Sequence, residues 1–244
     1  MEKKVTPYKD SEENKKKQVA KMFDTISGTY DRLNRVISLG ADLKWRDRVV
    51  ELVLKQHPKN ILDIATGTGD LAILFAQETK ASEIIGLDLS EGMLSIAKQK
   101  IANSSFSNKI QFIQGDSEAL PFPNDHFEAI TVSFGIRNFE NLELGLSEIF
   151  RVLSPSGILV ILETSVPKKF PWKQGYQFYS KGILPIIGKI FSKDKVAYKY
   201  LSESASVFPH GEALNNILRK IGFIEVKNAP QTLGVATIYT ATKK

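Results

Sequence analysis

The chain has 244 residues, of which 42% are hydrophobic, 25% charged and 9% aromatic, fractions that exclude disordered and collagen-like proteins. The formal net charge of +6 and the pI of 9.3 permit an acidic partner, such as a nucleic acid or an anionic membrane surface. The absence of cysteine excludes disulfides, thiolate metal sites and cysteine nucleophiles.

No stretch approaches the ~18 consecutive apolar residues that a membrane-spanning helix needs. The first residues, rich in lysine and acids, lack both an apolar signal core and the composition of a transit peptide. We therefore expect a cytoplasmic protein. His57, His126 and His210 lack metal-ligand spacing, so no metal site is expected.

The N-terminal part, residues 1–58, is predicted to be a helical lead-in that caps the substrate site. Its first ~20 residues are polar and expected to be frayed. A helix should follow, because Phe23, Ile26, Tyr30 and Leu33 recur on one helical face. A second amphipathic helix is expected over residues 42–54.

Residues 59–244 form the main domain, in which strands alternate with helices. Strands are predicted at 60–65, 84–88, 110–114, 129–134, 158–163, 223–226 and 235–240. Helices are predicted at 70–78, 92–101, 142–153 and 212–221. Continuous apolar strands between amphipathic helices indicate an α/β, Rossmann-like fold. We expect seven strands in a mostly parallel sheet with helices on both faces.

An insertion at 166–206 interrupts this alternation. Between 166 and 200 it has eight aromatic residues and eight lysines, including Trp172, Phe178 and Phe191. Such a mixture predicts a helical, apolar lid whose rim touches anionic lipid. An insertion that completes the core or forms a homodimer contact is the alternative.

A glycine-rich loop, ATGTGD (65–70), joins the first strand of the main domain to a helix. Gly67 and Gly69 permit a tight turn and close approach of a ligand to the backbone. The spacing G-x-G-x-x-A also fits a dinucleotide fingerprint, and Asp88 lies where such a protein would hold a ribose hydroxyl. An NAD-dependent dehydrogenase is therefore a rival interpretation.

The acids around this loop favour a different cofactor. Asp63 comes just before the loop, Asp88 ends the second strand and Asp116 follows the third, so we expect them to ring one crevice at the carboxyl edge of the sheet. A pyrophosphate beside Asp63 and Asp70 would be repelled, since the loop has no Arg or Lys. S-adenosylmethionine suits these acids, because it has a sulfonium and an ammonium and no phosphate. We expect it to be held by Asp63, Gly67, Gly69, Asp88 and Asp116.

Motifs along nearly the whole chain resemble those of the ubiquinone/menaquinone C-methyltransferase family, a class I S-adenosylmethionine-dependent group. SFGIRN (133–138) and ALPFP (119–123) are specific for the family, whereas the loop within LDIATGTGDLA (62–72) marks only the superfamily. Ala65 and the turn SPSG (154–157) depart from the family pattern, at a loop rim and a turn. The resemblance implies cofactor contacts from Thr68, Asp88, Asp116, Ser117 and Ser133.

Members of this family methylate polyprenylated quinol rings. A ring carbon becomes nucleophilic when its ortho hydroxyl loses its proton, which for a phenol occurs near pH ~10 in water, so the site must stabilise an oxyanion. Arg137 is the candidate for that role, and Asn138 and Tyr30 are candidates to orient the ring hydroxyls. Alternatively, Arg137 pairs with an acid and Tyr30 belongs to the core.

The resemblance implies methylation of demethylmenaquinol to menaquinol, with a polyprenyl benzoquinol of ubiquinone biosynthesis as the alternative substrate. Because such a quinol resides in the membrane, we expect transient contact with the inner face of the membrane. An RNA methyltransferase would explain the high pI, but SFGIRN (133–138) lacks the Asn/Asp-Pro-Pro-aromatic element that clamps a base amine. No nucleic-acid partner is expected.

Overall fold

The computed structural model describes residues 5–167, 170–179, 182 and 195–244, and within them a seven-stranded sheet has the order β3-β2-β1-β4-β5-β7-β6. The strands are β1 (Asn60–Ile64), β2 (Glu83–Asp88), β3 (Ile110–Gln114), β4 (Phe127–Ser133), β5 (Leu153–Thr164), β6 (Ile224–Gln231) and β7 (Ala236–Thr242). β7 pairs antiparallel with β5 and β6, and the other pairs are parallel. The predicted fold class is confirmed.

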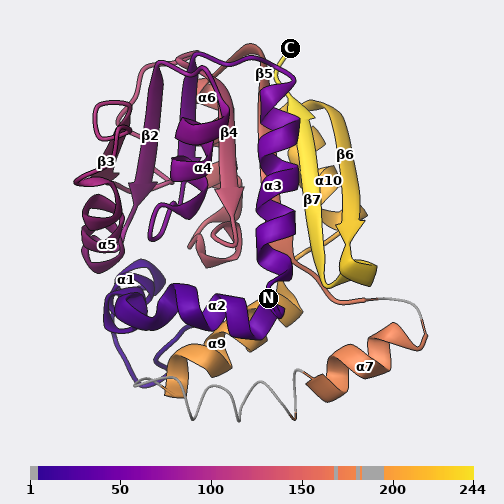
Figure 1. Ribbon diagram of the computed structural model, residues 1–244. Coiled ribbons are helices and arrows are strands. Elements are labelled where there is room, and N and C mark those ends of the chain that lie inside the picture. Colours follow the sequence, from indigo (N-terminus) through magenta and orange to yellow (C-terminus); the bar gives the residue numbers. More distant parts are fainter. Residues whose placement is uncertain (1–4, 168–169, 180–181, 183–194) are drawn as a thin grey trace.

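Helices cover both faces of the sheet, which is why its central strands are apolar on both sides. One face packs against α3 (Ala41–Leu54), α4 (Asp70–Glu78) and α5 (Glu91–Ile101). The other packs against α6 (Leu142–Val152) and α10 (Glu212–Ile221) (Figure 1). α3, which belongs to the N-terminal part, shares its core with β5 of the main domain.

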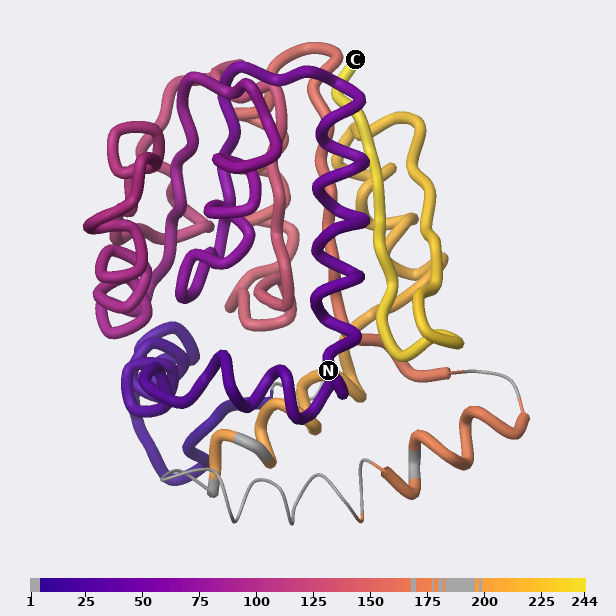
Figure 2. The backbone as a smooth tube through the Cα atoms, viewed as in Figure 1, coloured from indigo at the N-terminus to yellow at the C-terminus, as the bar shows by residue number. Residues whose placement is uncertain are grey.

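A second group of helices lies across the carboxyl ends of the parallel strands, as Figures 1 and 2 show. It consists of α1 (Lys15–Ile26), the short helix η1 (Ser27–Thr29), α2 (Tyr30–Ser38) and α9 (Lys195–Val207). The prediction of frayed residues is wrong from Lys15 on, because α1 begins there and buries Val19, Met22 and Ile26 against α5 and α9. The single predicted helix through Phe23 and Leu33 is two helices, separated at Ser27–Thr29.

The described parts of the insertion at 166–206 consist mainly of helix, at residues 172–178 and in α9. α7 (Trp172–Phe178) lies apart from the sheet, and Phe170, Trp172 and Phe178 are 80%, 49% and 73% exposed. Residues 168–169, 180–181 and 183–194, which include Phe191, lie outside the described residues. None of the helices in the described ranges has the length and apolar content that crossing a bilayer requires.

Candidate functional site

The loop between β1 and α4 is fixed to the end of β2 and approaches β3 closely. The backbone N–H of Gly67 donates to Asp88 Oδ2 at 2.8 Å. Gly67 and Gly69 have φ angles of +58° and +80°, a region that favours glycine. A Cβ on Gly69 would also lie 2.6 Å from the Phe112 ring. Both glycines are therefore needed for the shape of the loop.

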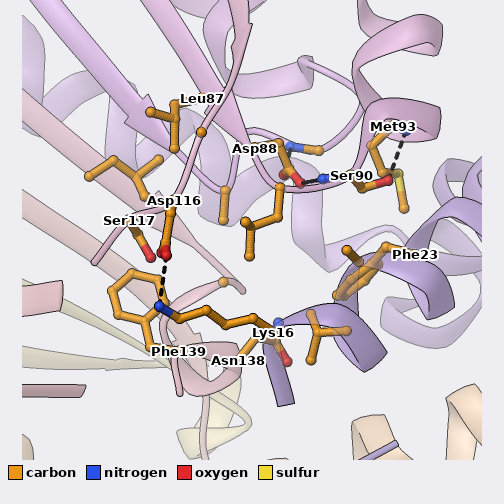
Figure 3. Close-up of a pocket in the computed structure, with 18 of the residues that line it drawn as sticks. Lys16, Phe23, Leu87, Asp88, Ser90, Met93, Asp116, Ser117, Asn138 and Phe139 are labelled. Atoms are coloured by element: carbon orange, nitrogen blue, oxygen red, sulfur yellow. Dashed lines mark hydrogen bonds and ion pairs between the residues drawn. The ribbon is translucent and has the colours of Figure 1, made fainter. Parts of the chain in front are cut away.

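A cavity beside this loop, here called the cofactor cavity, opens at the carboxyl edge of the sheet (Figure 3). Its described lining has three acids, Asp88, Asp116 and Glu118, and one cation, Lys16. This excess of acids fits S-adenosylmethionine, which needs acceptors for an ammonium, an amine and two hydroxyls, better than a pyrophosphate. The expected site residues that line it are Gly67, Asp88, Asp116, Ser117, Ser133, Tyr30 and Asn138.

Ser133 supports the same interpretation of the cavity. Its Oγ is buried and has no hydrogen-bond partner within the described part of the protein. An unpaired buried hydroxyl is unfavourable, so a polar group that enters the cavity gains a hydrogen bond here. Nearby, Asp88 accepts from the backbone N–H of Ser90 at 2.9 Å through its other oxygen. Burial raises the pKa of Asp88, although its hydrogen bonds to Ser90 and Gly67 oppose this.

Asp63 lies beneath the loop rather than among the residues that line the cofactor cavity. It is 1% exposed, and its two oxygens accept from Thr66 Oγ1 and Thr131 Oγ1, both at 2.6 Å. Burial raises its pKa to about 6, against the effect of both hydroxyls. Its position therefore gives Asp63 a role in holding the loop to β4.

Thr68 and Gly69 also lie outside the described lining of the cofactor cavity. Thr68 donates its hydroxyl to Asp31 Oδ1 on α2 at 2.6 Å. Lys100 Nζ on α5 lies 2.6 Å from both Asp31 and Asp70. The repulsion expected from Asp70 is thus relieved by a lysine far away in the sequence, and this network ties α2 to the loop.

Three polar residues of α1 attach this helix to the loops beside the cofactor cavity, and the sequence analysis missed all of them; Lys16 also lines the cavity. Lys16 Nζ reaches Asp116 Oδ2 at 2.7 Å (Figure 3) and Glu118 Oε2 at 3.0 Å. Lys15 Nζ donates to the backbone carbonyls of residues 137 and 139, at 3.0 and 2.7 Å. Asp24 accepts from Ser90 Oγ at 2.6 Å. No sequence pattern marks these contacts, because they join residues 66 or more positions apart.

A second cavity, here called the aromatic cavity, lies between α2, α3, α7 and α9. Its walls are mainly apolar and aromatic, and it meets the cofactor cavity at Tyr30 and Phe134, which line both. Burial raises the pKa of Tyr30, so its hydroxyl is protonated at neutral pH. The aromatic and polar residues that line the cavity include Trp45, Tyr176, Tyr179, Ser38, Asp42 and Arg137.

Arg137 lines the aromatic cavity and is 9% exposed. Its Nη1 lies 2.5 Å from Glu163 Oε1 and donates to the Phe134 carbonyl at 2.8 Å. Its Nε is buried without a hydrogen-bond partner among the described residues. Burial would lower the pKa of Arg137, but the Glu163 carboxylate outweighs this and raises it. The acid pairing weighed as an alternative is thus present, and the buried Nε–H is available to another acceptor.

Asn138 follows Arg137 in the short helix η2 (Ile136–Asn138), yet the two residues line different cavities. Asn138 lines the cofactor cavity, and its Oδ1 accepts from the Tyr200 hydroxyl at 3.1 Å. Burial raises the pKa of Tyr200 to about 12. In the described ranges no group of His, Asp and Glu could hold a metal ion.

Comparison with known sequences relates the chain to methyltransferases. A model of the ubiE/COQ5 methyltransferase family matches residues 10–243. The chain is 45% identical over 240 residues to a demethylmenaquinone methyltransferase of Bacteroides fragilis, covering 98% of each chain. It is 41% identical to the ubiquinone/menaquinone biosynthesis C-methyltransferase UbiE of Geobacter sulfurreducens, covering 99% of this chain and 94% of the relative. The resemblance seen in the motifs is confirmed.

Solved structures show the same fold at low sequence identity. A SAM-dependent methyltransferase from Thermotoga maritima has a TM-score of 0.65 at 20% identity, covering 92% of this chain and 99% of that one. The [4+2]-cyclase SpnF has a TM-score of 0.66 at 18% identity, covering 98% and 97%. A cyclase and a methyltransferase share this fold, so the fold alone does not fix the reaction.

Proposed function

The chain belongs to the ubiE/COQ5 methyltransferase family, and we propose that it transfers the methyl group of S-adenosylmethionine to a ring carbon of demethylmenaquinol. One observation carries this proposal: an acidic cavity and an aromatic cavity meet at Tyr30 and Phe134. A methyl donor in the first and a flat, apolar ring in the second would share that junction. In-line transfer requires such positioning more than any covalent step by the protein.

S-adenosylmethionine supplies, when bound, an electrophilic methyl group on a sulfonium. Asp88, at the end of β2, would accept hydrogen bonds from the ribose hydroxyls, and Asp116 from the adenine amine. The Ser133 hydroxyl, which has no partner among the described residues, would gain one from the cofactor. Lys16 now holds Asp116, so we expect α1 to shift when the adenine amine takes that acceptor.

Arg137 is the group proposed to activate the quinol. Its free Nε would donate to the ring oxygen next to the carbon that is methylated, and its charge would stabilise the oxyanion there. Glu163 keeps the guanidinium in place through Nη1. Tyr30, protonated at neutral pH, would contact the ring where the cavities meet. Asn138 would help to orient a ring hydroxyl from the side of the cofactor cavity.

We further propose that the enzyme works at the inner face of the membrane, as a cytoplasmic protein that binds the bilayer transiently. The exposed aromatic side chains Phe170, Trp172 and Phe178 around α7 support this, since aromatic rings favour the headgroup region. A homodimer contact through the same residues is the competing role. Contact with nucleic acid is not proposed.

The test is a methyl-transfer assay with purified protein, labelled S-adenosylmethionine and short-chain quinols. We expect label in the naphthoquinol. A benzoquinol and RNA are tested in parallel as alternative methyl acceptors.

Arg137→Lys and Arg137→Ala should lower kcat at least 100-fold while cofactor affinity changes less than three-fold, because oxyanion charge is largest in the transition state. Label in RNA alone, or an Arg137→Ala variant with wild-type turnover, would overturn the corresponding assignment.

A further inference from the structure

Two polar residues at the α2–α3 junction form a pair in the aromatic cavity that the proposed reaction has not used. Ser38 ends α2, and Asp42 lies in the first turn of α3. The Ser38 hydroxyl donates to Asp42 Oδ1 at 2.6 Å, and both residues line the cavity. The turn between them contains Leu39 and Gly40, with φ angles of +52° and +77°, and this geometry brings the two side chains together.

Asp42 is 2% exposed, and its charge is compensated on the side away from Ser38. Its Oδ2 accepts from the guanidinium groups of Arg35 and Arg46. Arg35 is shared with Asp70, at 3.2 Å. A buried carboxylate with this many hydrogen bonds is fixed in position. The hydrogen bond from Ser38 Oγ to Asp42 Oδ1 therefore has a defined direction, because the serine donates its only proton to the Asp42 carboxylate.

A serine hydroxyl has one proton and two acceptor sites. With its proton donated to a carboxylate, Ser38 Oγ can only accept a hydrogen bond from a ligand. Arg137, which lines the same cavity, can only donate. Among the polar residues that line the cavity, Ser38 thus provides an acceptor and Arg137 a cationic donor, and Trp45 and Tyr179 contribute aromatic walls. This arrangement suits an aromatic ring with two oxygens of different protonation state.

We propose that Ser38, oriented by Asp42, is a positioning residue that binds the quinol hydroxyl next to the prenylated carbon. That hydroxyl keeps its proton and donates it to Ser38 Oγ. The other ring oxygen, next to the carbon that is methylated, lies at Arg137 and carries the negative charge. The two contacts together fix which oxygen ionises and therefore which ring carbon faces the methyl donor. This inference rests on the proposed function.

The test compares two substrates, the short-chain 2-prenyl-1,4-naphthalenediol and 3-prenyl-1-naphthol, which lacks only the hydroxyl assigned to Ser38. The naphthol has a lower intrinsic reactivity, but that difference is the same for every variant and cancels in the comparison. We expect Ser38→Ala to reduce the enzyme's preference for the diol, measured as the ratio of kcat/KM values, by about ten-fold relative to wild type. Much of the loss should be in KM for the diol.

Two variants control for a structural effect. Ser38→Thr keeps the hydroxyl and should keep the wild-type preference. Ser147→Ala removes an exposed hydroxyl on α6 that donates to the Glu143 carbonyl, and it should change nothing. A Ser38→Ala enzyme whose preference stays within two-fold of wild type would overturn the assignment of Ser38 while leaving the proposed function intact. A wild-type enzyme that methylates neither compound would overturn both.

Discussion

Asp88 is the residue on which we expect cofactor binding to depend most, because it fixes the loop to β2 and is the proposed acceptor for the ribose hydroxyls. We expect Asp88→Ala to lower the affinity for S-adenosylmethionine at least ten-fold, since two ribose hydroxyls lose a charged acceptor and charged hydrogen bonds contribute ~1.5–3 kcal/mol each. Calorimetry measures this directly. Asp125→Ala, which removes an exposed partner of Lys243, is the matched control. An Asp88→Ala affinity within two-fold of wild type contradicts the assignment.

Asp63 gives the folded protein a specific dependence on pH. Its pKa rises from an ordinary 3.8 to about 6 because it is buried, so the folded protein holds this proton more tightly than the unfolded chain. Its contribution to stability therefore falls as pH rises from about 4 to 6 and is constant above that. One pKa unit corresponds to about 1.4 kcal/mol, so the change is on the order of 3 kcal/mol.

This dependence can be measured by denaturant unfolding of the wild type and Asp63→Asn at several pH values. The free energy of unfolding of the wild type, relative to that of the variant, should decrease between pH 4 and 6. Asn does not titrate. The other titratable groups contribute equally to the pH dependence of both proteins, so their contributions cancel in the difference. A difference that is constant or increases over this range would show that Asp63 is ionised in the folded protein with an ordinary pKa.

The three strand-end aspartates also show what could be predicted at the scale of residues. Their position at the carboxyl edge follows from the alternation of strands and helices, and Asp88 and Asp116 do line the cofactor cavity. The direction of each side chain does not follow from it. Asp63 points to the hydroxyls of Thr66 and Thr131, and only the packing of β1 against β4 brings Thr131 to it.

The residues that follow β1 and β4 pack closely against each other. A Cβ on Gly135 would lie 2.3 Å from the Cβ of Ala65 and 3.4 Å from Val132 Cγ1. We expect Gly135→Ala to destabilise the protein by ~1–3 kcal/mol through overpacking, which lowers Tm by several degrees. Ala65→Gly should restore most of that loss, because it removes the clashing atom and glycine tolerates the φ of +53° at position 65.

Thermal unfolding of the two single variants and the double variant tests this coupling. The double variant should be more stable than the sum of the single effects by ~1 kcal/mol or more. Additive effects would mean that Gly135→Ala destabilises through some other contact. Ser147→Ala again provides a control without a buried contact.

Most elements of the main domain could be predicted, because buried strands and amphipathic helices have distinct periodicities. The wrong predictions concern segments whose local sequence is compatible with more than one structure. The helix through Phe23 and Leu33 breaks at Ser27–Thr29, although the apolar spacing continues across the break. α1 looked too polar to be ordered. Its lysines and Asp24 have partners in the loops that follow β2, β3 and β4, and no local pattern reveals these contacts.

Across the whole molecule, the helices α1, α2, α7 and α9 lie at one edge of the sheet (Figure 2). Residues of these helices line the two cavities. The sequence indicated a cap and an aromatic insertion. It could not indicate that the cap and the insertion together enclose the aromatic cavity, because that cavity combines residues 30–45 with residues 176–205. Such a juxtaposition depends on the tertiary fold rather than on local patterns.

The proposed membrane contact predicts weak, reversible binding to vesicles that contain anionic lipid. Trp172→Ser/Phe178→Ser should lower co-sedimentation several-fold, and high salt should lower it for the wild type, since each lysine near an anionic surface contributes ~1 kcal/mol. Leu144→Ser, which changes a 45% exposed leucine on α6, is the matched control. If neither the α7 substitutions nor salt alters partitioning, the aromatic residues have a core or dimer role instead.

The central claim is that this chain methylates demethylmenaquinol, and the quinone content of cells tests it most directly. Mass spectrometry of quinones should show that a strain without the gene accumulates demethylmenaquinone and lacks menaquinone. The wild-type gene should restore menaquinone, and the Arg137→Ala gene should not. Unchanged menaquinone in the strain without the gene would contradict the claim.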